Sequence, residues 1–409
     1  MIESIDFKLA GNTGKRVCID LSGRNVIITG ANGCGKTRFL RQLNNYLQQF
    51  LQRQIEPIAQ IEQQLASYKN QLNNISLADS SYSFYQSQIE LLTKRVESLS
   101  NEIMTFKDVE LIFSLVNSNN MILRFFDANR LTNQLAANGH IESISNMKAQ
   151  GKNESLLQDS SDKFERYLVG YYNYGSHVIA REKDLEKSKQ IDGWFNKVES
   201  DLQNLFEDFE LALKYNAEEQ VFYIVQNGKD PFRFNNLSSG YSSILSIYAD
   251  LLMKVELRDI PADQMAGIVL IDEIDAHLHV SIQRKIFSFF AKAFPRIQFI
   301  ITTHSPFVVQ SVNDAIIYDL SKMECLEDLS MYSYESILKG LLGVDSTSNL
   351  LNEQLELMAK LIQQRPINKD GLQKVVNLIE PHEVQLDSKS KAFLLLGKNA
   401  LLDANDGEE

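Results

Sequence analysis

The stretch GANGCGKT, which begins at Gly30, carries residue types that bind phosphate. Its spacing, G-x-x-x-x-G-K-[ST], is typical of a loop whose backbone N–H groups surround the phosphates of a nucleotide. Gly30, Gly33 and Gly35 allow the backbone angles that bring those N–H groups against phosphate oxygens. Lys36 supplies a positive charge for the β- and γ-phosphates, and Thr37 a hydroxyl for Mg²⁺. The sequence therefore predicts ATP and Mg²⁺ as cofactors.

Two adjacent carboxylates form the second candidate group. The apolar run GIVLI ends directly at Asp272 and Glu273. A carboxylate at the carboxyl end of a strand beside a phosphate loop can hold Mg²⁺ through water, which makes Asp272 a metal residue together with Thr37. The neighbouring carboxylate can polarise the attacking water, so Glu273 is the predicted general base.

A histidine follows the next predicted strand, in the stretch ITTHSP. A lone histidine is more often a structural residue than a catalytic one. His304 lies one strand–helix unit after Glu273, however, and at the end of a parallel strand. We therefore expect His304 to hydrogen-bond the γ-phosphate or the lytic water.

The stretch LSSGYSS offers a second place where an anion could bind. Ser238 and Gly240 open a predicted helix, so a hydroxyl and backbone donors are present together. Because the phosphate loop already serves this chain's own nucleotide, the economical partner is the ATP of another subunit. Serine is also a good helix N-cap, so a purely structural role stays open from the residues alone.

The elements that must position these residues indicate an α/β fold with a mostly parallel sheet flanked by helices. The first 29 residues contain two strands of alternating apolar residues and then a short buried strand before the phosphate loop. A helix with apolar residues at helical spacing follows the loop. From Leu237 onward, strands and helices alternate. The expected elements there are a helix over 237–254, a strand over 267–273, a helix over 280–294, and strands over 297–305 and 315–320.

Between these parts, two arms carry apolar residues that step by three and four, from Ile58 to Ile75 and from Tyr82 to Ile103. Such heptads separated by a short polar break predict an antiparallel coiled-coil hairpin. Arms of about 18–22 residues would be roughly 27–33 Å long. The alternative is a pair of ordinary amphipathic helices lying on the domain.

Other stretches give weaker signals. We expect strands over 109–116 and 121–130, then a polar insertion or lid over 131–163. Helical spacing predicts helices over 164–172 and 191–213, and a turn rich in Asn and Gly predicts a hairpin. The hairpin strands would be 221–225 and 232–234. From Ser333 onward the chain is predicted to be helical and to pack as a C-terminal cap.

Composition limits the function further. The chain has 409 residues and a net charge of −12, which argues against a general grip on nucleic acid, although a local basic groove stays open. No apolar run approaches the ~20 residues of a membrane span, and the first residues lack the order of a signal peptide, so we expect a cytoplasmic protein without membrane contact. Cys18, Cys34 and Cys325 form no CxxC pair, so neither a disulfide framework nor a zinc site is indicated.

Four motifs in order, GANGCGKT, LSSGYSS, LIDEIDAHLH and ITTHS, resemble the Walker A, signature, Walker B with D-loop, and switch-histidine motifs of ABC-type ATPase heads, more narrowly of the RecF/SMC/OLD branch. The resemblance implies that two heads sandwich two ATP molecules. Ser238, Ser239 and Gly240 would reach the partner's γ-phosphate, and Asp275 would lie in the loop that crosses the interface. The remaining nucleotide-binding positions that it implies are Asn32, Cys34 and Arg38.

Two details qualify the resemblance. His277 and His279 have a spacing that suggests metal, but we interpret them as residues at the start of a helix. The stretch FDANR occupies the region of the Q-loop and has no glutamine, so Asn129 or Arg130 is the candidate substitute, and the rate of hydrolysis stays open.

The implied domains are the N-terminal part of the head with the phosphate loop (1–56), the coiled-coil hairpin (57–107), the rest of the head (108–330) and a helical C-terminal region (331–409). The predicted hairpin is short, and the sequence has neither a CxxC zinc hook nor the residue clusters of a TOPRIM nuclease. In these respects the chain resembles the ATPase subunits of bacterial anti-phage systems such as Septu, PARIS and retron-linked modules. This resemblance implies an ATPase, of fast or slow turnover, whose ATP-dependent dimerisation regulates a partner nuclease such as an HNH protein. Nucleic acid would be contacted through that partner. The alternative is a RecF-like DNA-repair ATPase that clamps DNA between two heads.

Overall fold

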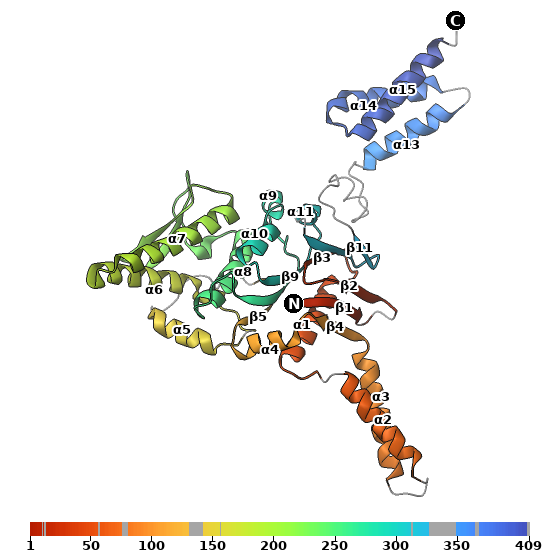
Figure 1. The fold of residues 1–409 in the computed structure, drawn as a ribbon. Helices are drawn as coiled ribbons and strands as arrows, with labels where there is room; N and C mark the ends of the chain where they lie inside the picture. Colours follow the sequence, from red (N-terminus) through yellow and green to blue (C-terminus); the bar gives the residue numbers. More distant parts are fainter. Residues whose placement is uncertain are drawn as a thin grey trace. The chain divides into compact units, whose positions relative to one another are not determined.

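A computed structural model of the chain describes residues 1–9, 11, 14–55, 58–75, 81–130, 142–155, 157–311, 314–326, 349–364 and 368–406 (Figure 1). The chain divides into two compact units, Met1–Tyr334 and Glu335–Glu409. The first unit contains all four sequence motifs.

The first unit is organised around a six-stranded sheet with the strand order β11-β10-β3-β9-β8-β5. All neighbouring strands are parallel except β11, which pairs antiparallel with β10. Every residue of β8 and β9 is buried, as expected for central strands covered on both faces. The strands are β3 (Asn25–Thr29), β5 (Met121–Phe126), β8 (Ala266–Ile271), β9 (Ile297–Thr302), β10 (Ala315–Asp319) and β11 (Glu324–Leu326). The predicted parallel sheet is confirmed.

A second, antiparallel sheet has the order β2-β1-β4 and is formed by β1 (Ile2–Lys8), β2 (Arg16–Asp20) and β4 (Glu102–Phe106). Helix α1 (Lys36–Leu51) follows the phosphate loop, and its buried apolar face belongs to a core cluster that contains residues of both sheets. Phe39 of α1, for example, lies edge-on to Phe7 of β1, with 6.4 Å between the ring centroids. Because α1 is held by apolar contacts to both sheets, the phosphate loop at its start has a rigid base.

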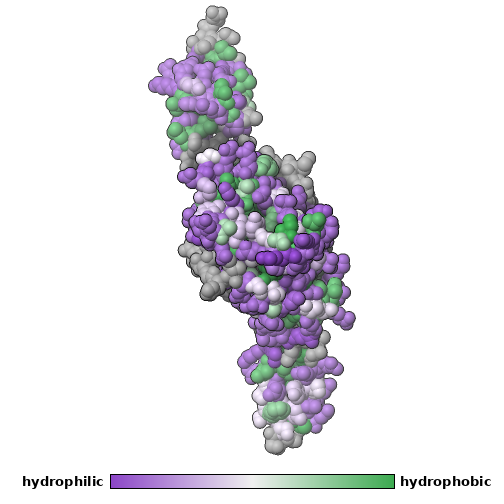
Figure 2. Space-filling view, turned by 90° about the vertical axis from the view of Figure 1, so that its left-hand side faces the viewer, coloured by the Kyte–Doolittle hydropathy of each residue, from purple (hydrophilic) through white to green (hydrophobic). Residues whose placement is uncertain are grey.

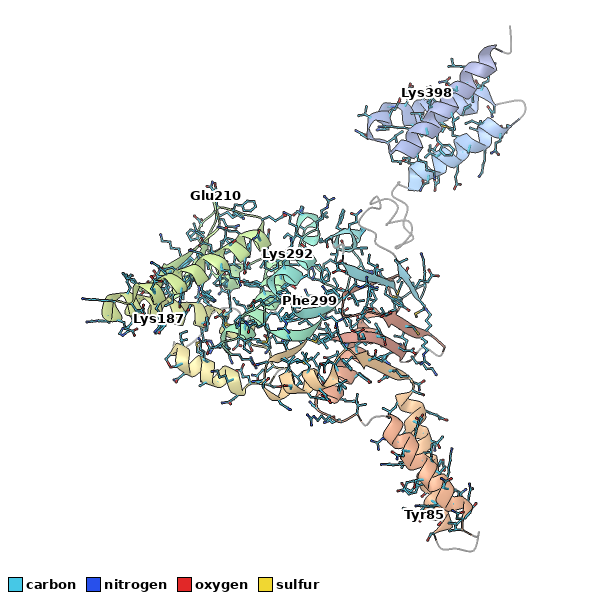
Figure 3. The ribbon with its side chains drawn as sticks, viewed as in Figure 1. Tyr85, Lys187, Glu210, Lys292, Phe299 and Lys398 are labelled. Atoms are coloured by element: carbon cyan, nitrogen blue, oxygen red, sulfur yellow. The ribbon has the colours of Figure 1, made fainter. Side chains whose placement is uncertain are left out.

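Helix α8 (Ser239–Glu256) is buried along almost its whole length, from Gly240 to Val255. A helix that is apolar or buried all round lies in the interior of a domain. It is covered by the helical hairpin of α6 (Phe164–His177) and α7 (Leu185–Phe206), and Tyr248 of α8 lies against Phe164 and Phe294. Phe299 of β9 lies in the interior of the head (Figure 3). The other elements of the head are α4 (Val109–Asn117), α5 (Ile144–Asn153), β6 (Ala212–Asn216), β7 (Val221–Val225), α9 (Val280–Gln283), α10 (Ile286–Ala293) and α11 (Pro306–Gln310).

The coiled-coil hairpin is confirmed. Helices α2 (Ile58–Asn73) and α3 (Tyr82–Leu99) pack on each other and extend away from the sheets (Figure 1). The ring of Tyr68 contacts those of Phe84 and Tyr85 near the far end, with centroid distances of 6.5 and 5.9 Å. The arms have 16 and 18 residues, so each is about 24–27 Å long, which is shorter than the sequence suggested.

The predicted strand over 109–116 is wrong, because these residues form helix α4. Asp108 caps this helix by accepting a hydrogen bond from the backbone N–H of Leu111 at 2.8 Å. An N-cap aspartate satisfies an otherwise unpaired donor and so favours a helix over the strand that Val and Ile suggest. Apolar residues at helical spacing, of which Ile112 is buried, were the second signal.

Four other predictions need correction. The helix predicted over 191–213 ends at Phe206, because Glu207 adopts a left-handed backbone with φ of 54°, and strand β6 follows. Strand β7 pairs with β6 along five positions, whereas the predicted partner 232–234 contributes only a single bridge through Phe232. The helix expected over 280–294 is divided into α9 and α10, and the expected lid contains helix α5. Residues 131–141 of that lid lie outside the described part.

The described part of the second unit, residues 349–364 and 368–406, is helical, as predicted. Helices α13 (Asn349–Gln363), α14 (Lys369–Ile379) and α15 (Ser388–Asp406) surround their own core, which includes Met358, Leu372 and Leu394. Apolar side chains also occur on the surface of this unit (Figure 2). Leu395 and Leu402, for example, are exposed. Packing of this unit on the head as a cap stays a prediction. Among the described residues, no helix is both long enough and apolar enough to cross a membrane.

Candidate active site

The predicted motifs meet at one edge of the large sheet. Strands β3, β9, β8 and β5 lie side by side in that order, and their carboxyl ends point the same way because they are parallel. The phosphate loop follows β3, His304 follows β9, and an acidic turn, residues 272–275, follows β8. Ligands of open α/β sheets bind outside the carboxyl ends of the strands. The fold therefore brings together residues from both ends of the head's sequence.

The phosphate loop has the backbone that its glycines predict. Gly30, Gly33 and Gly35 have φ values of 135°, 75° and 108°, a region that other residues rarely adopt. Lys36 is buried, and its ammonium donates hydrogen bonds to the carbonyls of Gly30 at 2.8 Å and Ala31 at 3.1 Å. No side chain caps the start of α1, so its first N–H groups are available to an anion.

Ser321, in the loop after β10, contacts the phosphate loop and was not predicted. Its hydroxyl accepts a hydrogen bond from the N–H of Ala31 at 2.7 Å, and its own N–H donates to Asp319 at 2.8 Å. A Cβ atom at Gly30 would lie only 2.7 Å from the Ser321 hydroxyl, so the close approach requires glycine. A lone serine after a strand gives no signal in the sequence, because only the pairing of β10 with β3 brings it here.

The carboxylate of Asp272 has one hydrogen-bonded oxygen and one oxygen without a hydrogen-bond partner. The side chain is buried, and its Oδ1 accepts a hydrogen bond from the hydroxyl of Thr302 at 2.6 Å. The same hydroxyl accepts from the N–H of Glu273 at 2.7 Å. The Oδ2 atom of Asp272 is buried without a hydrogen-bond partner.

This donor set fits Mg²⁺. The ion prefers oxygen ligands, keeps several waters, and is bound through one or two carboxylates together with substrate phosphates. The spare oxygen of Asp272 and the half-buried hydroxyl of Thr37 would supply the protein's share. Within the described ranges no three His, Cys, Asp or Glu side chains form a ready-made metal cluster.

The acidic turn has a strained backbone. Glu273 has a φ of 46°, and His277, just beyond the turn, has a φ of 64°. A non-glycine residue in this region costs roughly 1–2 kcal/mol, and such strain tends to occur at functional sites. Strand β9 holds the turn in place, because Thr303 donates a 2.5 Å hydrogen bond to Asp275 and the carbonyl of Thr302 accepts from Ile274.

His304 lies among the charges of the site. Partial burial lowers the pKa of its imidazole below the ordinary 6.5, and the positive charge of Lys36 lowers it further. Asp275, Glu273 and Asp272 act in the opposite direction with smaller effect. The imidazole is therefore neutral at pH 7, the form that can both accept and donate a hydrogen bond near a lytic water.

The serine turn, residues 238–240, presents its hydroxyls outward. Ser238 occupies the N-cap position of α8 but its side chain makes no capping hydrogen bond, and both Ser238 and Ser239 are exposed. Gly240 is buried, and a Cβ atom there would lie 2.4 Å from the carbonyl oxygen of His277. The serine turn thus packs beside the loop after β8. The loop after β8 itself lies two strands from the phosphate loop, about 10 Å at ~4.8 Å per strand.

The other predicted residues lie around these groups. Asn32 is exposed on the phosphate loop, Cys34 is half-buried with its sulfur 3.8 Å from the Lys36 ammonium, and Arg38 is exposed at the start of α1. His279 caps helix α9 by accepting from the N–H of Ser281, which confirms its interpretation as a helix-start residue. In the Q-loop region, Asn129 is exposed, and the replacement of the glutamine by Asn129 or Arg130 stays a prediction.

Comparison with known families identifies the head. The family described as "AAA domain, putative AbiEii toxin, Type IV TA system" matches residues 26–310, from β3 to the helix after His304. The chain belongs to this family. This AAA-domain ATPase has the mostly parallel sheet, flanking helices and helical C-terminal region described above, and its family implies nucleotide binding.

Individual relatives match shorter stretches. "Septu protein PtuA" of Bacillus mycoides (strain KBAB4) is 31% identical over 195 residues, covering 45% of this chain and 27% of that protein. "Retron Vc95 probable ATPase" of Vibrio cholerae serotype O1 biovar El Tor is 34% identical over 104 residues, covering 25% of this chain and 20% of that protein. The matched part thus spans less than a third of either relative. Among solved structures, an SMC head bound to the C-winged helix domain of ScpA aligns with a TM-score of 0.36 and 16% identity, over 79% of this chain and 95% of that one.

Proposed function

We propose that this AAA-domain ATPase binds ATP at the carboxyl edge of its sheet and hydrolyses it between two copies of the head. The observation that carries the proposal is the serine turn. Its hydroxyls are exposed and make no capping bond, although the turn begins a long buried helix. The same chain already has a complete phosphate loop, which follows β3. We infer that the turn of Ser238, Ser239 and Gly240 binds the γ-phosphate of an ATP held by a second copy of the head. Asp275 would lie at the same interface.

The chain's own residues then have distinct roles. Lys36 leaves the loop carbonyls and binds the β- and γ-phosphate oxygens, helped by the N–H groups at the start of α1. When bound, Mg²⁺ neutralises charge that develops on the phosphates, and Thr37 and Asp272 would hold it. Glu273 accepts a proton from the attacking water, and neutral His304 orients that water or the γ-phosphate.

We further propose that ATP-dependent pairing of heads regulates a partner nuclease, such as an HNH protein, in anti-phage defence within the cytoplasm. The similarity to a Septu protein and to a retron ATPase supports this function. The net charge of −12 favours a protein partner over direct DNA clamping of the RecF type. ATP would stabilise the paired state by mass action even if turnover is slow. Nuclease activity that requires both proteins and responds to ATP would support this role. DNA binding by the chain alone, weakening steeply with salt, would favour the alternative.

The sandwich is tested by Glu273→Gln, which keeps the side-chain volume but removes the base. We expect this variant to bind ATP without hydrolysing it and to accumulate in the paired state. Light scattering should show that the molecular mass of the particle doubles when ATP and Mg²⁺ are added. Glu273→Gln combined with Lys36→Ala is the control, because it should not respond to ATP. A mass that is unchanged by ATP in the single variant would contradict the sandwich.

A further inference from the structure

Arg130 links two parts of the head that the proposed function keeps separate. Its guanidinium donates hydrogen bonds to the backbone carbonyls of Asp272 at 2.6 Å and Glu273 at 3.1 Å. It also donates to the hydroxyl of Ser243 at 2.7 Å. The first two acceptors belong to the acidic turn of the head's own nucleotide site. The third lies on α8, the helix that begins with the serine turn.

Ser243 is rigidly connected to the serine turn. It is buried on α8 five residues after Ser238, about 7.5 Å along the helix axis at 1.5 Å per residue. Because α8 is buried along most of its length, a small shift at Ser243 moves the start of the helix with it. Arg130 therefore connects the acidic turn of one site to the surface that meets the other site.

The electrostatics of Arg130 depend on the state of its own nucleotide site. The guanidinium of Arg130 lies near the carboxylates of Asp272, Asp275 and Glu273, whose negative charges attract it. The Nε atom of Arg130 is buried without a partner, so one donor is unused in this arrangement. A cation bound at Asp272 would weaken the attraction between the acidic turn and Arg130. Occupancy of the site thus changes the forces on the link.

We propose that Arg130 is a positioning residue that couples the two nucleotide sites of the paired heads. It transmits the state of the acidic turn to α8, so that a head that has bound its own ATP presents its serine turn correctly to the partner's ATP. This inference rests on the proposed sandwich. Coupling of this kind is a free energy shared between two sites, and it can be measured as a change in pairing that is separate from binding to one head.

Ser243→Ala is the sharpest test, because it removes one hydroxyl from the link and leaves the bonds to the acidic turn intact. In the Glu273→Gln background, we expect ATP affinity of the single head within about twofold of the parent. ATP-driven pairing should be weakened about tenfold or more, the scale of one hydrogen bond to a charged group. Ser246→Ala is the matched control, since that hydroxyl lies one turn further along α8 and bonds only the local carbonyl of Ser243.

Four outcomes are distinguishable. Weakened pairing in Ser243→Ala, together with the same effect in Arg130→Gln and none in Ser246→Ala, supports the coupling. Pairing of Ser243→Ala equal to that of Ser246→Ala overturns the coupling while the sandwich stands. Failure of the Glu273→Gln parent to pair with ATP overturns the sandwich and the coupling together. Loss of ATP binding to the single head in Ser243→Ala would also overturn the coupling, because it would mark a local defect of the site.

Discussion

Thr302→Val should destabilise the head through the buried carboxylate that this threonine holds. Valine has nearly the same shape but no hydroxyl, so the variant loses the bond to Asp272 Oδ1 at 2.6 Å and the acceptor for the Glu273 N–H at 2.7 Å. A hydrogen bond to a charged group contributes about 1.5–3 kcal/mol, and an unpaired backbone N–H costs about 1 kcal/mol. The other oxygen of Asp272 has no partner that could compensate. We therefore expect a loss of about 2–4 kcal/mol.

The assay is thermal unfolding of the full chain without nucleotide. At roughly 2 °C per kcal/mol for a large domain, the melting temperature should fall by about 4–8 °C. Thr303→Val is the matched control, because the Thr303 hydroxyl likewise donates to a carboxylate, that of Asp275, and accepts from a backbone N–H, that of Ser305 at 2.9 Å. The carboxylate of Asp275 is partly exposed, so water can replace its lost bond. The melting temperature of Thr303→Val should fall less. A Thr302→Val protein that melts within about 2 °C of the wild type, or together with Thr303→Val, would refute this reasoning.

Two further substitutions test other parts of the head. Lys36→Ala should abolish ATP binding, because it removes the buried ammonium from the phosphate loop. An affinity for ATP that is unchanged in a binding titration would contradict the assignment of this loop to the nucleotide's phosphates. Lys254 is buried, and burial lowers its pKa to about 8. Between pH 8 and its ordinary value of 10.5, the unfolded chain binds the proton that the folded head has released, so stability should rise with pH by about 3 kcal/mol. Lys254→Met should not show this rise in the free energy of unfolding. Urea unfolding of the wild type and of Lys254→Met at pH 8 and at pH 10.5 measures it, and an equal rise in both proteins would contradict the prediction.

The sequence predicted the parts of the site that local chemistry defines. The glycine spacing at Gly30, Gly33 and Gly35 predicted a left-handed backbone, and all three have positive φ. The apolar run before Asp272 predicted a buried strand, and β8 is buried at every position. Such features follow from neighbouring residues alone. They are therefore readable without knowledge of the tertiary fold.

The residues that sequence reasoning missed act across the sheet. Thr302 holds Asp272 because β9 lies beside β8, and Ser321 contacts the phosphate loop because β10 lies beside β3. The two threonines directly before His304 were a usable signal of contact with the acidic turn. Thr302 donates a hydrogen bond to Asp272, and Thr303 donates one to Asp275. Residues 109–116 form helix α4 rather than the predicted strand because the cap from Asp108 outweighs the strand preference of Val and Ile. Strand order is a tertiary property, and no single stretch of sequence contains it.

The most direct test of the account mixes two inactive variants. Lys36→Ala destroys the phosphate loop, and Ser238→Arg blocks the exposed serine turn, so each variant alone should hydrolyse no ATP. In a mixed pair, the intact phosphate loop of one copy faces the intact serine turn of the other, which restores one site. With random pairing, about half of the pairs are mixed, and we expect roughly a quarter of the wild-type rate. A mixture that stays as inactive as its two components would contradict an active site built from both copies.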